Sequence, residues 1–504
     1  MTAVTAWLDR VLGRVTMYAL MIICLVVLAV VSLLFTVLGW LPFTPVALLC
    51  NAAVLLIFSY LANGFGGLVF RTRPQLSSTA ITALLLLFIF PPKLDLPSLG
   101  GVALAAVVAV LAKYLLAWRG RHIFNPAAIG AFLVGLTGLT FSFWWIGTPL
   151  LLPFVAVAGF LILFRTRRFP LALVFIVVAT LNIVIRYAIT GVPIGTGIGL
   201  ALLSSPIVFF ACFMLDEPLT LPPRRWQQVT EAVVVGLLFQ LGFSFGTFSS
   251  TPEFALVVGN LLAFFWGQRR GIRLDFVGRT QLTPTSWQFD FRPHAPVRFV
   301  PGQFMELALP HGKTDARGWR RVFSIASAPS ADLVRFATRM PERSSSFKSA
   351  LLALEPGAVV TATSVSGDFL LPKDPSKPLL LVAAGIGITP YISQLEHLTA
   401  TGEKRDIVVL YSVPAADEVG FADVLKAAGC RVVILSPNRP TELPKSWSWA
   451  GEGELSSEQI HKTVPDAASR TTYLSGPPEV VAGLERALQR DGVKWIVTDV
   501  FIGY

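Results

Sequence analysis

The chain has 504 residues, of which 54% are hydrophobic and only 14% are charged, a composition typical of a membrane protein. Its formal net charge of +11 does not indicate a nucleic-acid partner. The arginines of the apolar half lie in short loops between apolar runs, where positive residues set membrane topology. The four cysteines are scattered without a CxxC pair, so we expect neither an iron–sulfur cluster nor a metal site.

Residues 1–270 predict a polytopic bundle of membrane-spanning helices. About ten apolar runs approach the roughly 20 residues that a spanning helix needs. Arginines recur in alternate loops, from Arg10 and Arg14 to Arg269 and Arg270, and the loops between them carry almost none. By the positive-inside rule, this alternation predicts a multi-pass protein of the cell inner (cytoplasmic) membrane with both termini in the cytoplasm. The runs are centred near residues 27, 53, 84, 108, 133, 157, 179, 205, 237 and 260.

Histidine usage bears on haem. Only one of the five histidines, His122, lies in the apolar half. A haem held between membrane helices needs histidine ligands that face inward. We therefore expect no haem, which disfavours the haem-containing membrane reductases.

Three short polar stretches interrupt the apolar half, at residues 71–74, 121–127 and 215–220. In these stretches Asn125 opens one helix and Asp216 closes another. Polar groups are costly to bury near a membrane face and usually have a partner. They could bind a ligand, or they could be helix caps and interfacial turns.

Taken together, Ser78–Pro92, His122–Gly130 and Phe209–Pro223 resemble the membrane flavin subunits of the sodium-pumping NADH:quinone oxidoreductase and of the Rnf complex. The resemblance implies a flavin held between helices, with Asn125 and Asp216 as hydrogen-bond partners. That family attaches FMN through a threonine in a Ser/Asp-Gly-Ala-Thr stretch, which this chain lacks. We therefore expect any FMN or riboflavin here to be bound non-covalently.

The second half of the chain has the pattern of a soluble protein. Short alternating stretches separated by Gly and Pro in residues 271–375 predict a small antiparallel β-barrel. Residues 376–504 alternate apolar strands with helices, which predicts a parallel α/β nucleotide-binding domain. The expected fold is thus multi-domain, with a helical membrane bundle, a barrel and an α/β domain in that order.

Four motifs of this half occur in one order: Arg321-Val-Phe-Ser324, Gly385-Ile-Gly-Ile-Thr-Pro390, Tyr473-Leu-Ser-Gly-Pro-Pro478 and the ending Asp499–Tyr504. In this order they resemble the ferredoxin-NADP reductase family of FAD enzymes. The resemblance implies FAD on the barrel and a nicotinamide dinucleotide on the α/β domain.

For FAD, the resemblance assigns the diphosphate to Arg321, the flavin ring to Phe323 and the flavin's reactive nitrogen to Ser324. Phe323 replaces the family's tyrosine, which keeps the stacking surface but loses the phenol. The segment Arg343–Ser349 resembles a second diphosphate clamp. Its phosphate donors would be Ser345, Ser346 and Lys348. Without the other motifs, Arg321 would more simply be an exposed arginine on a barrel strand.

For the dinucleotide, the glycines of the second motif let a diphosphate approach the backbone where a helix begins. The third motif matches the family's nicotinamide loop, with serine in place of cysteine. The terminal aromatic residue would cover the flavin until nicotinamide displaces it. The residues expected here are Gly385, Gly387, Thr389, Pro390, Ser412, Ser475, Gly476, Pro477 and Tyr504.

The sequence after Ser412 bears on the choice between NADH and NADPH. The next residues are uncharged and are followed by Asp417 and Glu418, which would repel the extra phosphate of NADPH. NADH is therefore slightly favoured, although Lys404 or Arg405 could reach that phosphate.

Together, these expectations predict a membrane-bound NAD(P)H dehydrogenase. Hydride passes to FAD, with Ser324, Ser475 and Tyr504 along its path. Electrons then pass to a membrane flavin or quinone, and possibly on to an extracytoplasmic redox protein.

Two alternatives stay open. A redox-driven Na+/H+ pump subunit predicts acidic residues well inside the membrane. The sequence suggests almost none, because Asp216 and Glu217 lie at an edge. A membrane-anchored flavin reductase would need only one or two spans.

Overall fold

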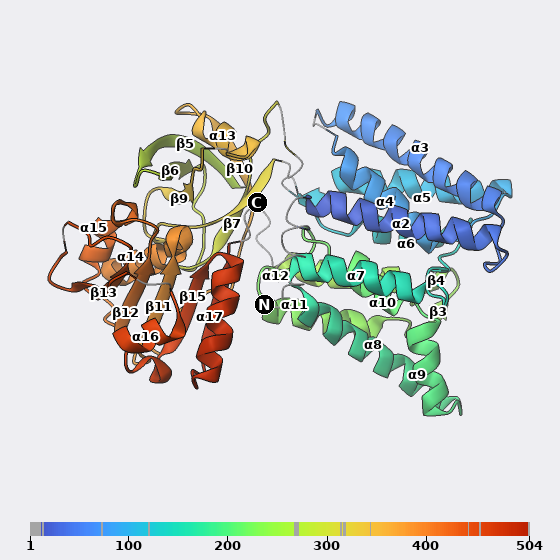
Figure 1. Ribbon diagram of the computed structural model, residues 1–504. Helices are drawn as coiled ribbons and strands as arrows, with labels where there is room; N and C mark the ends of the chain where they lie inside the picture. Colours follow the sequence, from blue (N-terminus) through green and yellow to red (C-terminus); the bar gives the residue numbers. More distant parts are fainter. Residues whose placement is uncertain are drawn as a thin grey trace. The chain divides into compact units, whose positions relative to one another are not determined.

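The computed structural model describes residues 12, 15–71, 74–118, 121–266, 272–312, 315, 319–342, 344–441, 443–452 and 455–501. Arg10, Arg14, Arg269 and Arg270, on which the predicted topology partly depends, lie outside these ranges, as do Arg343 and Tyr504. The chain divides into two compact units, one formed by residues 15–270 and one by residues from 271 onward (Figure 1).

The first unit is helical, and nine of the ten predicted centres fall on helices. The tenth, near residue 205, falls at the break between two of them. Its helices are α2 (Met17–Val37), α3 (Pro45–Val69), α4 (Leu76–Ile89), α5 (Leu96–Leu115), α6 (Pro126–Gly135), α7 (Leu152–Thr166), α8 (Phe169–Ile189), α9 (Ile194–Leu203), α10 (Ile207–Phe209), the π-helix η1 (Phe210–Met214), α11 (Arg225–Leu238) and α12 (Pro252–Trp266). Two short hairpins, β1–β2 (Ala117–Trp118, Arg121–His122) and β3–β4 (Ser244–Phe245, Phe248–Ser249), join some of them.

Not all of these helices are long enough to cross a membrane. Within the described residues, four helices are long and apolar enough to cross a membrane: α2, α3, α5 and α8. The pair Ile194–Leu203 and Ile207–Met214, bent by 51°, makes a fifth if it is one span. The other helices are shorter, partly because proline ends one at Pro91 and starts another at Pro126. The structure therefore gives four or five candidate spans.

Small residues let these helices pack closely. A Cβ atom at Gly130 of α6 would lie 2.5 Å from Cβ of Ala109 on α5. One at Gly259 of α12 would lie 2.3 Å from Val235 on α11. Only glycine permits such close approach, as is common between helices in membranes.

The second unit begins with a six-stranded antiparallel sheet, in the order β8-β7-β10-β5-β6-β9. A bridge between Ile325 and Phe336 joins its two ends and closes it into a barrel. Helix α13 (Ser346–Leu352) adds Phe347 and Leu351 to the barrel core. The strands are β5 (Ile272–Gln281), β6 (Ser286–Pro293), β7 (Phe304–Ala308), β8 (Arg320–Ser324), β9 (Val334–Arg339) and β10 (Val359–Ser366).

The remainder of this unit is a parallel sheet in the order β14-β13-β12-β11-β15-β16. Helices α14 (Thr389–Thr401) and α15 (Ala422–Ala427) pack on one face, and α16 (Ser457–Thr463) and α17 (Pro478–Arg490) on the other (Figure 1). The strand order reverses between β11 and β15, which makes this pair the topological switch point of the sheet. The strands are β11 (Leu379–Ala384), β12 (Ile407–Ser412), β13 (Arg431–Leu435), β14 (Trp447–Trp449), β15 (Thr471–Gly476) and β16 (Ile496–Val500).

Helix α14 joins the barrel to the parallel sheet. Ser393 donates to the carbonyl of Ser327 at 2.7 Å. Glu396 accepts from the backbone N–H of Ala328 at 2.7 Å and also binds Arg335. The antiparallel and parallel sheets predicted from the sequence are therefore both present, and they pack as one unit.

Candidate functional site

The glycine loops that follow β11 and β15 touch at the switch point. Ala383 and Ser475 are paired across the two strands. A Cβ atom at Gly387 would lie 2.4 Å from the carbonyl oxygen of Ser475, and one at Gly476 would lie 2.8 Å from Cβ of Ala384. Gly385 has a positive φ of 56° and open space around it. Doubly wound sheets bind ligands outside the carboxyl ends of their strands at such a point.

Ser475 carries a buried hydroxyl at this point. Its side chain is 2% exposed, and its Oγ has no hydrogen-bond partner among the described residues. Leaving such a group unpaired costs about 1–3 kcal/mol, which a bound ligand could recover. Thr472, three residues earlier on β15, has an unpaired hydroxyl as well.

Two helices begin beside these loops. Thr389 is the first residue of α14, is followed by Pro390, and donates its hydroxyl to the carbonyl of Ile386 at 3.0 Å. Pro477 precedes α17. Helix N-termini favour anions such as a diphosphate, so the structure brings Gly385, Gly387, Thr389 and Gly476 together with two such termini.

Ser412 ends the neighbouring strand β12, opposite Ala384. Glu418 does not face this strand end freely, because it accepts hydrogen bonds from Thr283 at 2.6 Å and Thr285 at 2.9 Å on the barrel. Glu418 is therefore expected to repel an NADPH phosphate less than the sequence suggests. Asp417 is exposed, so it is the acidic residue that could repel that phosphate.

Arg405 was a candidate for binding the NADPH phosphate, and the structure contradicts it. The residue precedes β12, whereas Ser412 ends that six-residue strand, about 20 Å away at 3.3 Å per residue. Its guanidinium contacts Glu403 at 2.6 Å and the carbonyl of Pro372 at 2.8 Å.

On the barrel, Arg321 and Ser346 converge on one carboxylate, that of Asp315. The Nη2 atom of Arg321 lies 3.4 Å from Oδ1 of Asp315. Oδ2 accepts from the backbone N–H of Ser346 at 3.1 Å, and the N–H of Asp315 donates to the Ser346 hydroxyl at 2.9 Å. His311 also lies 3.0 Å from that hydroxyl. Asp315 and His311 belong to no motif, and nothing in the sequence marks either residue as part of a site.

The other residues of the second clamp have local roles. Ser345 caps α13 by accepting from the backbone N–H of Lys348 at 3.4 Å. The ammonium of Lys348 donates to the carbonyl of Arg339 on β9 at 2.7 Å. These two residues thus lie beside Ser346 but already make protein contacts.

The stacking of Phe323 on a flavin stays a prediction. It faces the barrel interior opposite Met305, is 7% exposed, and packs 5.8 Å from the Phe347 ring and 6.1 Å from the Phe336 ring. A flavin could stack on it only if this end of the barrel opened. Ser324 follows it as the last, buried residue of β8.

The last described residue lies beside the loop that follows β15. The backbone N–H of Phe501 donates to the carbonyl of Gly476 at 2.9 Å. The predicted role of Tyr504 lies beyond the described residues and stays a prediction.

In the helical unit, Asn125 and Asp216 lie close together, but protein contacts occupy them. Asn125 caps α6 through the N–H of Ala128 at 3.1 Å and donates to the carbonyl of Met214 at 3.2 Å. Asp216 is fully buried, with its two carboxylate oxygens bound by Arg168 at 2.8 Å and Thr166 at 2.7 Å. The contacts match helix caps and turns rather than flavin partners.

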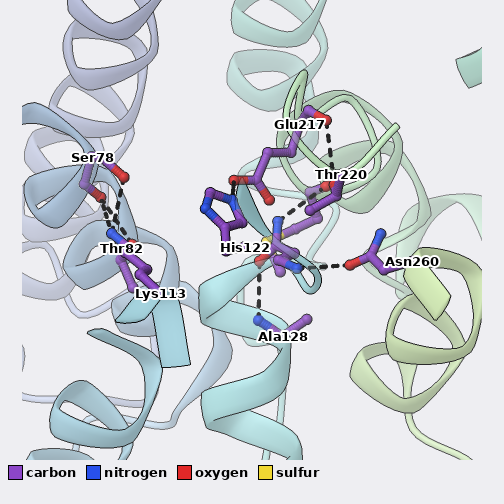
Figure 2. Close-up of polar contacts among 10 residues, drawn as sticks. Ser78, Thr82, Lys113, His122, Ala128, Glu217, Thr220 and Asn260 are labelled. Atoms are coloured by element: carbon purple, nitrogen blue, oxygen red, sulfur yellow. Dashed lines mark hydrogen bonds and ion pairs between the residues drawn. The ribbon is translucent and has the colours of Figure 1, made fainter. Parts of the chain in front are cut away.

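Two further polar contacts in this unit join residues that are far apart in the sequence. Figure 2 shows Lys113, whose ammonium donates to the carbonyl and hydroxyl oxygens of Ser78 at 3.0 and 2.9 Å. It also shows His122 with Nε2 3.0 Å from Oε1 of Glu217. The other oxygen of Glu217 is buried without a hydrogen-bond partner among the described residues. Ionisable groups inside an apolar unit are rare and commonly functional.

The sequence suggests almost no acidic residues well inside this half, yet two glutamates are buried in it. Glu231 in α11 and Glu253 in α12 are 0% and 2% exposed. A single glutamate gives no periodic signal, so the sequence pattern does not show that either side chain is buried. Among the described residues, no group of three or more His, Cys, Asp or Glu side chains could hold a metal ion.

No protein-family model matches the chain. Its C-terminal half is similar to an NADPH oxidoreductase of Mycobacterium tuberculosis, at 33% identity over 204 residues, which cover 39% of this chain and 48% of that protein. It is also similar to the NADH oxidoreductase HCR of Escherichia coli, at 25% identity over 215 residues, covering 42% and 63%. The chain spans about half to two-thirds of the length of these relatives.

The crystal structure of an Amycolatopsis cytochrome P450 reductase, GcoB, aligns with 46% of this chain and 70% of its own, at 22% identity and a TM-score of 0.40. A score this low adds nothing to the sequence comparison. The sequence relatives confirm that the C-terminal half resembles ferredoxin-NADP reductase-type oxidoreductases. The resemblance of the helical half to membrane flavin subunits stays a prediction.

Proposed function

We propose that the protein is a membrane-bound NAD(P)H dehydrogenase, with a transmembrane domain at 1–270, an FAD-binding barrel at 271–375 and an NAD(P)-binding domain at 376–504. The observation that carries the proposal is the switch point, where touching glycine loops and the unpaired hydroxyl of Ser475 lie at the carboxyl ends of β11 and β15. The similarity to NAD(P)H oxidoreductases supports it.

On the barrel, the guanidinium of Arg321 and the backbone N–H of Ser346 would bind the FAD diphosphate, because both already bind one carboxylate. On the sheet, Gly385 and the start of α14 would bind the dinucleotide diphosphate. Ser475 would orient the nicotinamide with its free hydroxyl. FAD, when bound, accepts a hydride and releases electrons singly.

The helical unit would hold the next electron carrier. Its four or five candidate spans support insertion in a bilayer, and the alternating arginines favour an inner membrane with cytoplasmic termini. The Lys113 ammonium, which binds Ser78, and the His122–Glu217 pair are the polar groups that would bind a non-covalent FMN, a riboflavin or a quinone head group (Figure 2). A quinone or an extracytoplasmic redox protein would be the final acceptor.

NADH is slightly favoured as the electron donor. No basic residue follows Ser412 directly, and Arg405 lies before the opposite end of β12. The relatives do not decide the matter, since one is named for NADPH and another for NADH.

The first test is flavin content and reduction of the full chain purified in detergent. We expect FAD by acid release and chromatography, with FMN or riboflavin beside it if the membrane carrier is a flavin. NADH should bleach the FAD absorbance under anaerobic conditions. A preparation that folds but neither retains nor binds added FAD would overturn the proposal.

Two variants make this test specific for the switch point. Ser475→Ala should slow flavin reduction by NADH without lowering stability, because the hydroxyl makes no protein hydrogen bond. Thr472→Val is the matched control, since it removes another unpaired hydroxyl from the same strand. Equal rates in both variants would exclude a role for Ser475 in positioning nicotinamide.

A further inference from the structure

Besides Asp216, two glutamates are buried among the described residues of the helical unit, and their surroundings differ. Glu253 at the start of α12 accepts hydrogen bonds from the Ser142 hydroxyl at 2.5 Å and the Trp144 indole N–H at 2.9 Å. Glu231, six residues into α11, is 0% exposed, and neither of its oxygens has a hydrogen-bond partner among the described residues. The two groups are therefore a natural pair for comparison.

The neighbours of Glu231 on α12 and α8 do not neutralise it. On α12, a Cβ atom at Gly259 would lie 3.5 Å from its Oε1, so the carboxyl faces that helix. The side chain of Asn260 and the charge of Arg168, at the start of α8, both favour the ionised form of Glu231, but less than burial disfavours it. Both also bind other residues: Oδ1 of Asn260 accepts from the N–H of Asn125 at 2.7 Å, and Nη1 of Arg168 donates to Asp216 at 2.8 Å.

Burial of this kind favours the uncharged form of Glu231. An ionised carboxylate without donors in an apolar interior costs several kcal/mol. Binding a proton removes that cost. Glu231 lies about 9 Å along the axis of α11 from Arg225, at 1.5 Å per residue. Asn260, which influences Glu231, also accepts a hydrogen bond from the N–H of Asn125, the cap of α6.

We propose that Glu231 is a proton-binding site of the helical unit, which holds a proton in the oxidised protein and exchanges it when the protein is reduced. The second part rests on the proposed function. NADH gives NAD+, one proton and two electrons, and a quinone takes up two electrons and two protons to become a quinol. Glu231 would donate one of these protons and recover it from water.

Infrared spectroscopy of the full chain in detergent tests the site directly. We expect a protonated carboxyl C=O band in the oxidised wild-type protein that shifts in 2H2O. The band should be absent from Glu231→Gln and present in Glu253→Gln, the matched buried glutamate. An identical band in wild type and Glu231→Gln would overturn the proposal. Should Glu231→Gln fail to fold, Glu231→Asp should instead shift the band.

Reduction by NADH in the same cell tests the exchange. Flavin absorbance reports whether electrons arrive, so a failure of the proposed dehydrogenase function is seen separately as unbleached flavin. If the flavin bleaches, the Glu231 band should lose intensity or shift in the reduced-minus-oxidised spectrum. Bleaching with an unchanged band would overturn the coupling of proton exchange to reduction.

Discussion

The carboxylate of Asp315 bridges the guanidinium of Arg321, at 3.4 Å, and the first backbone N–H of helix α13, that of Ser346, at 3.1 Å. The Arg321 guanidinium carbon also lies 5.2 Å from the centre of the Phe347 ring, whose position is fixed in the barrel core. The Arg321 guanidinium and the Ser346 N–H are the donors that a diphosphate on this barrel would need. An internal anion thus holds the proposed phosphate clamp in shape, and FAD must displace it to bind.

Replacing Asp315 should therefore strengthen FAD binding. Asp315→Asn removes the competing negative charge, and we expect FAD affinity to rise by roughly tenfold, the equivalent of one charged hydrogen bond of about 1.5 kcal/mol. Titration of the flavin-free full chain by FAD fluorescence measures the change. Asp332→Asn, which removes an exposed carboxylate with no contact to the clamp, should leave affinity unchanged. Weaker binding in Asp315→Asn would show that the carboxylate supports the bound cofactor.

Arg321 should be required for the same cofactor. Arg321→Gln removes the charge and the forked donors, and FAD affinity should fall by about 10- to 100-fold, as expected for one or two charged hydrogen bonds. Its neighbour Arg320, whose Nη1 atom lies 3.9 Å from Oε2 of Glu306, provides the control as Arg320→Gln. Similar losses in both variants would point to general electrostatics in place of a specific clamp.

Much of the fold could be predicted because its signals are local. Alternation in segments such as Val334–Arg339 and the apolar run Leu379–Ala384 gave the two kinds of strand directly. The number of membrane-spanning helices was less predictable. Apolar composition predicts a helix at Leu76–Ile89, but Pro91 ends that helix after 14 residues. A hydropathy pattern shows that a helix is apolar without showing that it is long enough to span a membrane.

The site was predictable where a motif lies on one loop, as for Gly385 and Gly387. The site was not predictable where the residues that contact one another come from distant parts of the chain. Asp315 meets Ser346 across 31 residues, and His122 meets Glu217 across 95, and no spacing rule connects such pairs. For Phe323, the motif gives the residue type but not the direction of the ring, which lies in the barrel interior.

Gly387 should be intolerant of any side chain. In Gly387→Ala the new methyl group would lie 2.4 Å from the carbonyl oxygen of Ser475, so the two loops must separate. We expect a loss of roughly 1–3 kcal/mol in stability and a large loss of flavin reduction by NADH. Thermal unfolding and anaerobic bleaching of the full chain measure the two effects.

Gly483→Ala is the matched control for that substitution. It lies on the exposed face of α17, with nothing within 4 Å of an added Cβ atom. Alanine should stabilise this helix by roughly 0.5–1 kcal/mol and leave the reduction rate unchanged. If Gly387→Ala behaves like this control, the two loops are not in contact at the switch point.

Tyr473 should make the second unit sensitive to alkaline pH. Burial raises the pKa of this phenol from 10 to about 12, and its hydroxyl donates to the carbonyl of Leu370 at 2.7 Å. The folded state therefore holds a proton that the unfolded chain releases near pH 10. Its contribution to stability is complete below pH 10 and is lost as the pH rises from 10 through about 12.

Tyr473→Phe isolates this group. The difference in tyrosinate absorbance between wild type and variant during an alkaline titration should show one phenol with a midpoint near 12, and the variant's thermal unfolding temperature should fall less steeply above pH 10. Some decline must remain, because burial also raises the pKa values of Tyr391 and Tyr411. A midpoint near 10 in the difference titration would mean that the Tyr473 hydroxyl reaches water, and that the hydrogen bond to Leu370 does not hold it inside the unit.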